Sequence, residues 1–220
     1  MFEKNAVDPE MLKLIKEIQS SSLFGNHILA GGTALAFQIG HRTSTDIDLF
    51  TSIMQNAISI IEYFKKNYKN IIVDIAQDDF TRIYVNNIKI ELIYDNEKLI
   101  ENPKNKENIR FFGINEISAM KIRAIQGRTE ARDFIDLAYL LQEMPLKKMF
   151  EKYKEKYGSI SETMVKRTIL TKCKSIKDDE WLVGIKMLRN DIKPKDVLKC
   201  IENGIEDYNN NKKIGKAVYD

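Results

Sequence analysis

Two spacings of apolar residues run along this chain, and the change from one to the other divides it near its middle. In the first half, apolar residues recur at helical intervals in three segments: 9–23, 34–39 and 53–64. Between these segments, short apolar runs or alternation predict five strands: 28–30, 47–50, 71–75, 82–85 and 88–93. The second half has helical spacing alone, which predicts helices over 115–126 and 131–141 and a lysine-rich helical region from residue 145 onward.

This order of elements predicts an α+β fold, because strands and helices mix in the first half and helices alone fill the second. We expect an α/β domain over residues 1–113 and a helical domain over residues 114–220. Asn86 and Asn87 separate two predicted strands, and since asparagine tolerates positive φ they predict a tight hairpin turn. The polar stretch 98–110, which contains Pro103, is expected to be a loop or linker.

Composition narrows the class of protein. Charged residues make up 30% of the 220 residues and the formal net charge is only +3, so weak attraction to nucleic acid is allowed but not indicated. No apolar run is long enough to span a bilayer, and the N-terminus has no secretory pattern. Cys173 and Cys200 have neither metal-type spacing nor the pattern of a disulfide framework. We therefore expect a cytoplasmic protein with no membrane partner.

A glycine turn followed by paired aspartates is the strongest chemical signal. Gly31, Gly32 and Thr33 come between a short apolar strand and a predicted helix, where the backbone N–H groups can approach a polyanion. Asp46 and Asp48 lie two apart on the next predicted strand, so both carboxylates leave the same face. Their β-carbons are about 6–7 Å apart, near enough to hold two cations about 3.5–4 Å apart. This combination predicts a nucleotide-transfer site that takes a nucleoside triphosphate (NTP).

The ligand types indicate which metal such a site would use. Carboxylate oxygens are hard ligands, and the chain has no cluster of His or Cys, so Mg²⁺ or Mn²⁺ is expected rather than zinc. Glu91 is the best candidate for a third metal-binding carboxylate, because it would project beside the aspartates if its strand neighbours theirs. The alternative is that Glu91 faces solvent and pairs with Lys89. Asp74 is the rival third acid.

Thr33 and Arg42 are candidates for phosphate binding, but each also has a possible structural role. Thr33 is expected to bind phosphate, and threonine is also a common helix N-cap. The two roles are compatible, because an anion would sit at the cap position. Arg42 lies between the turn and the aspartate strand and would reach a phosphate oxygen, although an arginine here is also an ordinary structural residue.

A second polar cluster lies on the helices predicted after residue 114. Phe134 and Leu137 fit an apolar helix face, which leaves Asp133 and Asp136 on its flank. Taken alone, this pattern is typical of an amphipathic helix with a surface ion pair between Arg132 and Asp136. Lys121 on the preceding helix would then be a solvated lysine.

These motifs together resemble one known family. Gly-Gly-Thr-Ala-Leu at 31–35, Gly-His-Arg-x-Ser-x-Asp-Ile-Asp-Leu-Phe at 40–50, Lys121, and Arg-Asp-Phe-Ile-Asp-Leu at 132–137 resemble the AbiEii/AbiGii toxin family of nucleotidyltransferases, in the DNA polymerase β-like superfamily. The resemblance implies a mixed β-sheet flanked by helices and followed by a helical C-terminal region. It also implies that Lys121 meets the nucleotide phosphates and that Asp133 or Asp136 is needed for activity. Glu91 stands where the superfamily frequently has aspartate.

The expected function is therefore a metal-dependent nucleotidyltransferase that moves a nucleoside monophosphate from an NTP to an acceptor hydroxyl. The resemblance implies a toxin with a separately encoded antitoxin, and tRNA as one acceptor, since some members act on tRNA ends. Lysines in the helical half would flank such an RNA. Two alternatives stay open: transfer to a small hydroxyl compound, and a non-catalytic nucleotide-binding or antitoxin-binding module.

Overall fold

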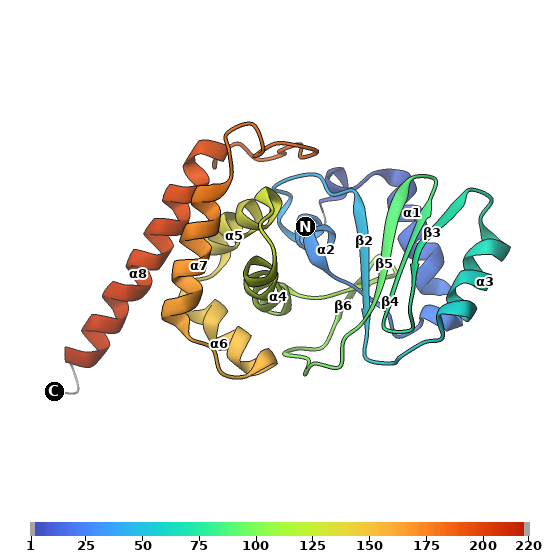
Figure 1. Cartoon of the computed structure of the whole chain (residues 1–220), viewed down its shortest axis with the longest axis horizontal. Coiled ribbons are helices and arrows are strands. Elements are labelled where there is room, and N and C mark those ends of the chain that lie inside the picture. The colour runs from blue at the N-terminus through green and yellow to red at the C-terminus, as the bar shows by residue number, and fades with distance from the viewer. Residues whose placement is uncertain (1–2, 218–220) are drawn as a thin grey trace. The chain divides into compact units, whose positions relative to one another are not determined.

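The computed structural model of the protein describes residues 3–217. The chain forms two compact units, Met1–Gly113 and Ile114–Asp220. Figure 1 shows that the first unit holds the sheet with its helices and that the second is built of helices. The predicted α+β fold, with a mixed sheet followed by a helical region, is confirmed.

A mixed seven-stranded sheet forms the centre of the first unit, in the order β3-β4-β5-β2-β1-β7-β6. Parallel pairing joins β2 to β5 and β1 to β7, and the other neighbours are antiparallel. The strands are β1 (Ile28–Leu29), β2 (Asp46–Thr51), β3 (Ile71–Ala76), β4 (Phe80–Val85), β5 (Ile88–Tyr94), β6 (Lys104–Lys106) and β7 (Ile109–Phe111).

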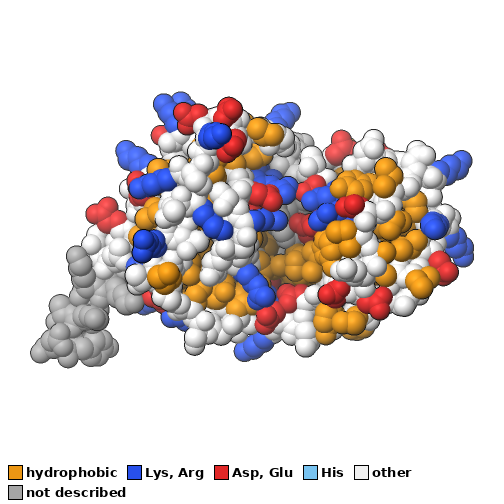
Figure 2. Space-filling view, in the orientation of Figure 1, with side chains coloured by type: hydrophobic (Ala, Val, Ile, Leu, Met, Phe, Trp, Pro, Cys, Tyr) orange, Lys and Arg blue, Asp and Glu red, His pale blue; other side chains and the backbone are white. Residues whose placement is uncertain are grey.

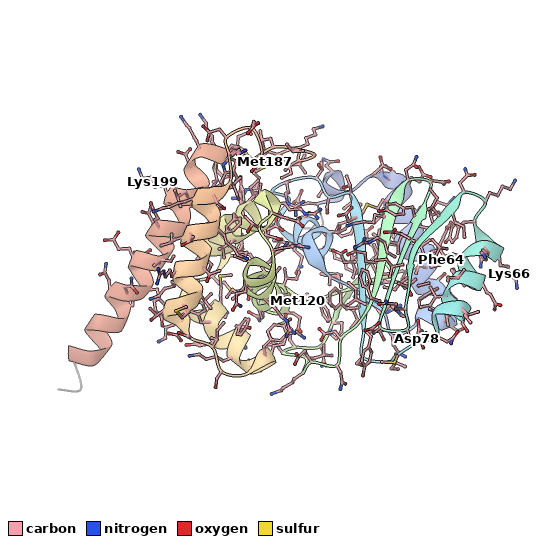
Figure 3. The ribbon with its side chains drawn as sticks, viewed as in Figure 1. Phe64, Lys66, Asp78, Met120, Met187 and Lys199 are labelled. Atoms are coloured by element: carbon pink, nitrogen blue, oxygen red, sulfur yellow. The ribbon has the colours of Figure 1, made fainter. Side chains whose placement is uncertain are left out.

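Three α-helices accompany the sheet: α1 (Pro9–Ser20), α2 (Gly31–Ile39) and α3 (Ala57–Asn67). Local sequence fixes where they begin. The Asp8 carboxylate accepts the N–H of Glu10 at 2.8 Å and caps α1, and Pro9 occupies its first turn. Figure 3 shows Phe64 directed from α3 toward the strands and Lys66 directed away from them, which matches their buried and exposed states. Short 3₁₀ helices cover Lys4–Ala6 and Ser22–Phe24.

The Asn-Asn hairpin prediction is confirmed, whereas the loop predicted for 98–110 is correct only for residues 98–103. Asn86 and Asn87 join β4 to β5 with φ of 49° and 66°. The stretch expected to be a loop contains β6 and β7, and β7 pairs in parallel with β1. Strands of three residues are too short to show a clear alternation in the sequence. The turn between them, with Glu107 and Asn108 at positive φ, resembles the turn at Asn86 and Asn87.

The second unit contains five α-helices among its described residues, and they enclose a core of their own. They are α4 (Ile114–Gly127), α5 (Ala131–Glu143), α6 (Leu146–Tyr157), α7 (Glu162–Ser175) and α8 (Val197–Ala217), with a 3₁₀ helix at Pro194–Asp196. The apolar face predicted for 131–141 is buried, since Phe134 and Leu137 are at most 1% exposed. Residues 177–193 form turns and irregular chain, although helix was expected there. Within 3–217, no helix is both long and apolar enough to cross a membrane.

Candidate functional site

The two aspartates of β2 and the glutamate of β5 lie on one face of the sheet. The parallel register places Asp48 opposite Glu91, and Asp46 opposite Lys89. The side chains between them, Ile47 and Ile90, are fully buried on the other face, whereas the charged residues are half-buried. We call the side of β2 and β5 that carries Asp46, Asp48 and Glu91 the acid face. Figure 2 shows acidic, basic and hydrophobic side chains gathered over the strands of the first unit.

The glycine bend is in direct contact with the acid face. Gly31 has a φ of +64°, a conformation that residues with a Cβ rarely adopt. A Cβ at this position would overlap the carboxylate of Asp48, so any other residue would force that side chain to move. The backbone N–H of Ala30 donates to the carbonyl of Asp48 at 2.9 Å and fixes this approach. The bend and the acid that we predicted to act together are therefore neighbours.

The helix begins at the glycines rather than after them. Ala30 is the N-cap of α2, and the first helical hydrogen bond joins the Ala34 N–H to the Ala30 carbonyl at 3.1 Å. The N–H groups of the three residues between them precede that bond and have no acceptor within the helix. Backbone donors at a helix N-terminus suit a phosphate group, and here they belong to Gly31, Gly32 and Thr33.

Thr33 is not the helix cap, because it lies inside α2 and the N-cap is Ala30. The side chain of Thr33 is 1% exposed, and its hydroxyl donates to the backbone carbonyl of Asp46 and lies 2.7 Å from the hydroxyl of Ser44. The Thr33 hydroxyl therefore fastens α2 to the start of β2, so that it positions the glycine bend relative to the aspartates.

Arg42 is also more buried than a surface arginine. It is 3% exposed, and its Nη1 donates to the carbonyl of Thr43 at 3.0 Å. This contact orients the guanidinium close to the chain that leads into β2. Its predicted role in phosphate binding stays a prediction.

Two cations share the acid face with the carboxylates. Lys89 Nζ lies 3.0 Å from Asp46 Oδ2 and 3.5 Å from Glu91 Oε1. Arg82 on β4 donates through Nε to Glu91 Oε1 at 2.8 Å and pairs through Nη1 with Asp74 at 3.1 Å. Burial acts to lower the pKa of Lys89, but its hydrogen bond to Asp46 and the nearby carboxylate charges outweigh burial and raise the pKa. Lys89 therefore remains an ammonium ion.

The order of the strands favours Glu91 over Asp74 as the third metal-binding carboxylate. Glu91 stands next to Asp48, whereas Asp74 belongs to β3, which is separated from β2 by β4 and β5. The condition on which the prediction for Glu91 depended, that β5 lies beside the aspartate strand, is met. The contact with Lys89 that we considered as an alternative is also present.

The donor set on the acid face fits a divalent cation that is bound together with a nucleotide. In the part of the chain that the structure describes, no group of three or more His, Cys, Asp or Glu side chains is arranged to hold a metal by itself. Mg²⁺ is commonly bound through one or two carboxylates plus substrate phosphates rather than in an all-protein cage. Asp46 and Asp48 are two carboxylates on the same face, and Asp48 lies beside the N-terminus of α2.

A buried ion cluster lies within the second unit. Lys121 Nζ on α4 contacts Asp133 Oδ1 at 2.8 Å and Asp136 Oδ2 at 2.6 Å, and Arg128 Nε contacts Asp133 Oδ2 at 2.7 Å. Both aspartates are 0% exposed, and the Lys121 side chain is 6% exposed. Burial acts to raise the pKa of Asp133, but Lys121 and Arg128 outweigh it and hold the pKa below its ordinary value.

The interpretation of this region as a surface ion pair with a solvated lysine is therefore wrong. Helical spacing gave the apolar face of α5 correctly but not the burial of its acids. Arg128, which directly follows α4, was given no role in the prediction.

The chain matches a known protein family over most of its length. The model of the family described as nucleotidyl transferase AbiEii toxin, type IV toxin–antitoxin system, matches residues 13–203. An uncharacterized protein of Aquifex aeolicus (strain VF5) is 29% identical over 168 residues, which are 73% of this chain and 81% of the relative.

Two solved structures from Helicobacter pylori share the fold. JHP933 has 16% identity and a TM-score of 0.56, with 96% of each chain covered. A protein provisionally described as a nucleotidyltransferase has 19% identity and a TM-score of 0.55, with 94% of this chain and 95% of that chain covered.

Proposed function

The chain belongs to the AbiEii family of nucleotidyltransferase toxins, and from this premise we propose that it moves a nucleoside monophosphate from an NTP to an acceptor hydroxyl with a divalent metal. The observation that carries the proposal is the contact between the bend at Gly31 and the carboxylate of Asp48. It joins a helix N-terminus, which suits phosphate, to a carboxylate pair, which suits metal.

We propose a separate role for each candidate site residue of the first unit. Asp46 and Asp48 would hold Mg²⁺ or Mn²⁺, and the backbone N–H groups of Gly32 and Thr33 would bind phosphate oxygens. When bound, the metal supplies charge neutralisation at the triphosphate and a more nucleophilic acceptor oxygen. The protein's own contribution is positioning: the Thr33 hydroxyl and the Ala30 N–H hold the bend against β2. Arg42 is proposed to face a phosphate oxygen.

Glu91 has a less direct role in this proposal than the two aspartates. Its Oε1 accepts Arg82 at 2.8 Å, and Lys89 lies 3.5 Å away, so much of its charge is already compensated. We propose Glu91 as the third carboxylate that binds the metal. To bind it, Glu91 would have to be freed by a movement of Arg82 and Lys89.

For the second unit, the proposal assigns Lys121 to the phosphates of the nucleotide, as the family resemblance implies. Asp133 and Asp136 hold the Lys121 ammonium at 2.8 and 2.6 Å, and Arg128 compensates the second negative charge. A lysine fixed by two acids needs no reorganisation when charge develops on a leaving pyrophosphate. Loss of either acid would remove one of the two carboxylates that hold Lys121.

The acceptor and the partner belong to the same proposal. Family membership supports a cognate antitoxin as partner. We propose an RNA end, including that of tRNA, as the acceptor. The second unit carries basic helix surfaces, with α6 and α7 rich in lysine, that would attract an RNA backbone.

The test is to incubate the protein with each of the four α-labelled NTPs, Mg²⁺ or Mn²⁺, and a cell extract. The label is then followed into RNA, protein and small-molecule fractions. We expect one NTP to label the RNA fraction. Label in the small-molecule fraction would replace the RNA acceptor by a small hydroxyl compound. NTP binding without release of pyrophosphate in any fraction would contradict transfer and favour a binding module.

A further inference from the structure

A row of alternating charges crosses the sheet and ends at the metal-binding acids. Four strands contribute to it, and each neighbouring pair of side chains lies between 2.8 and 3.5 Å apart. In order from the edge strand β3 to β2, the members are Asp74, Arg82, Glu91, Lys89 and Asp46. The last link places a lysine directly on an acid that the proposed function assigns to metal binding.

Lys89 is held at that place by the strand register and by its neighbours. It lies opposite Asp46 in the parallel pair of β2 and β5, so its side chain and that of Asp46 leave adjacent backbone positions on the same face. Glu91 Oε1 accepts Arg82 on one side and contacts Lys89 on the other. Arg82 is fixed in turn by Asp74. Lys89 is thus held between Glu91 and Asp46, and its ammonium contacts Asp46 Oδ2.

This arrangement has a consequence for a divalent cation. An ion bound to Asp46 would approach the same carboxylate that Lys89 contacts at 3.0 Å. A divalent ion and an ammonium that share one carboxylate would repel each other. Three carboxylates, Asp46, Asp48 and Glu91, are also partly compensated by two cations, which weakens the field that attracts metal.

We propose that Lys89 is a built-in counter-cation of the acid pair: it lowers the affinity for free divalent metal, so that metal is held firmly only together with a triphosphate. This inference rests on the proposed function, because it takes Asp46 and Asp48 as the metal-binding pair. The triphosphate supplies further oxygens to the ion and further negative charge, to which the displaced ammonium can turn. Lys89 therefore couples metal loading to nucleotide loading, and acts as a positioning residue rather than as a catalytic one.

The test measures Mn²⁺ binding to the full chain without nucleotide, by the electron paramagnetic resonance signal of free Mn²⁺. Lys89→Met removes the ammonium, and we expect its Kd for Mn²⁺ to fall on the order of tenfold below that of the wild type. Lys89→Gln removes the charge but keeps a hydrogen-bond donor, and should give the same change if the Met variant folds poorly. Lys89→Arg keeps the charge and should bind like the wild type.

Two further variants define the control and the site. Lys152→Met removes a lysine of similar exposure, 24% against 22%, that pairs with Glu155 on α6, and it should leave the Kd unchanged. The double variant Asp48→Asn/Lys89→Met should lose the tighter Mn²⁺ binding expected of Lys89→Met, because that binding requires both Asp46 and Asp48.

The outcomes separate this inference from the proposed function. An unchanged or weaker Mn²⁺ affinity in both Lys89→Met and Lys89→Gln overturns the counter-cation, whether or not the protein transfers nucleotide. If both variants bind Mn²⁺ more tightly but the wild type labels no acceptor with any NTP, the counter-cation stands and the proposed transfer fails. With ATP present, the difference in Kd for Mn²⁺ between the wild type and Lys89→Met should become smaller. A lysine with a purely structural role would not produce this effect of ATP.

Discussion

The carboxylate of Asp48 occupies the space that the Cβ of any other residue at position 31 would need. The contact is reinforced by the φ of +64° at Gly31 and by the hydrogen bond from Ala30 to the carbonyl of Asp48. It brings a phosphate-type helix terminus and a metal-type carboxylate to the same point of the sheet. The proposed reaction depends on this one contact more than on any other.

Gly31→Ala should therefore damage both stability and activity. The new methyl group meets the Asp48 carboxylate, and alanine adopts the positive φ unfavourably. We expect a loss of about 1–3 kcal/mol in the free energy of unfolding, measured with urea, and a large loss of nucleotide transfer. Gly127→Ala is the control, because a Cβ there would meet nothing within 4 Å. An active and fully stable Gly31→Ala variant would show that the contact is dispensable.

Thr33→Val tests whether the hydroxyl of Thr33 positions the bend. Valine has nearly the same shape but cannot donate to the Asp46 carbonyl or bond to Ser44. We expect a loss of about 1–3 kcal/mol in unfolding free energy and reduced transfer. Thr33→Ser keeps the hydroxyl and should recover most of both. If Thr33→Val keeps its stability and loses only NTP affinity, the hydroxyl binds the nucleotide and does not stabilise the fold.

His27 predicts a pH dependence of stability for the first unit. Burial, followed by the charge of Arg110, lowers the pKa of His27 from 6.5 to about 4. The unfolded chain therefore takes up a proton at a higher pH than the folded one, so stability falls as pH drops from about 6.5 to 4. The shift corresponds to about 3 kcal/mol over that window. Urea unfolding at pH 7, 5.5 and 4.5 should show this slope in the wild type. A His27→Gln variant with an equally steep slope would assign it to other groups.

The strands that carry the acid face were readable from sequence because each alternates apolar and polar residues. Ile47 and Leu49 face the core on β2, as Ile90 and Leu92 do on β5, and the charged residues between them take the other face. Period and turn chemistry thus predicted the orientation of Asp46, Asp48 and Glu91. They did not predict that Arg82, from a third strand, would pair with Glu91, because pairing across strands depends on register.

Burial of charge was the main feature that the sequence did not reveal. Asp133 and Asp136 looked like surface acids, because charged residues are seldom fully buried unless they are paired. Lys121 and Arg128 provide that pairing from the preceding helix and the turn after it. Helical periodicity describes one helix at a time, so it cannot indicate which side chains another helix brings. The resemblance to a known family identified these residues, although their roles stay predictions.

The most direct test of the central claim is the rate of Mg²⁺-dependent transfer from an α-labelled NTP in Asp46→Asn and Asp48→Asn. Asp79→Asn, an exposed acid at the turn before β4, is the matched control. If Asp46 and Asp48 hold the metal, each change should lower the rate on the order of 100-fold or more, while circular dichroism shows an intact fold and Asp79→Asn stays at the wild-type rate. Transfer near the wild-type rate in both Asp46→Asn and Asp48→Asn would contradict the account.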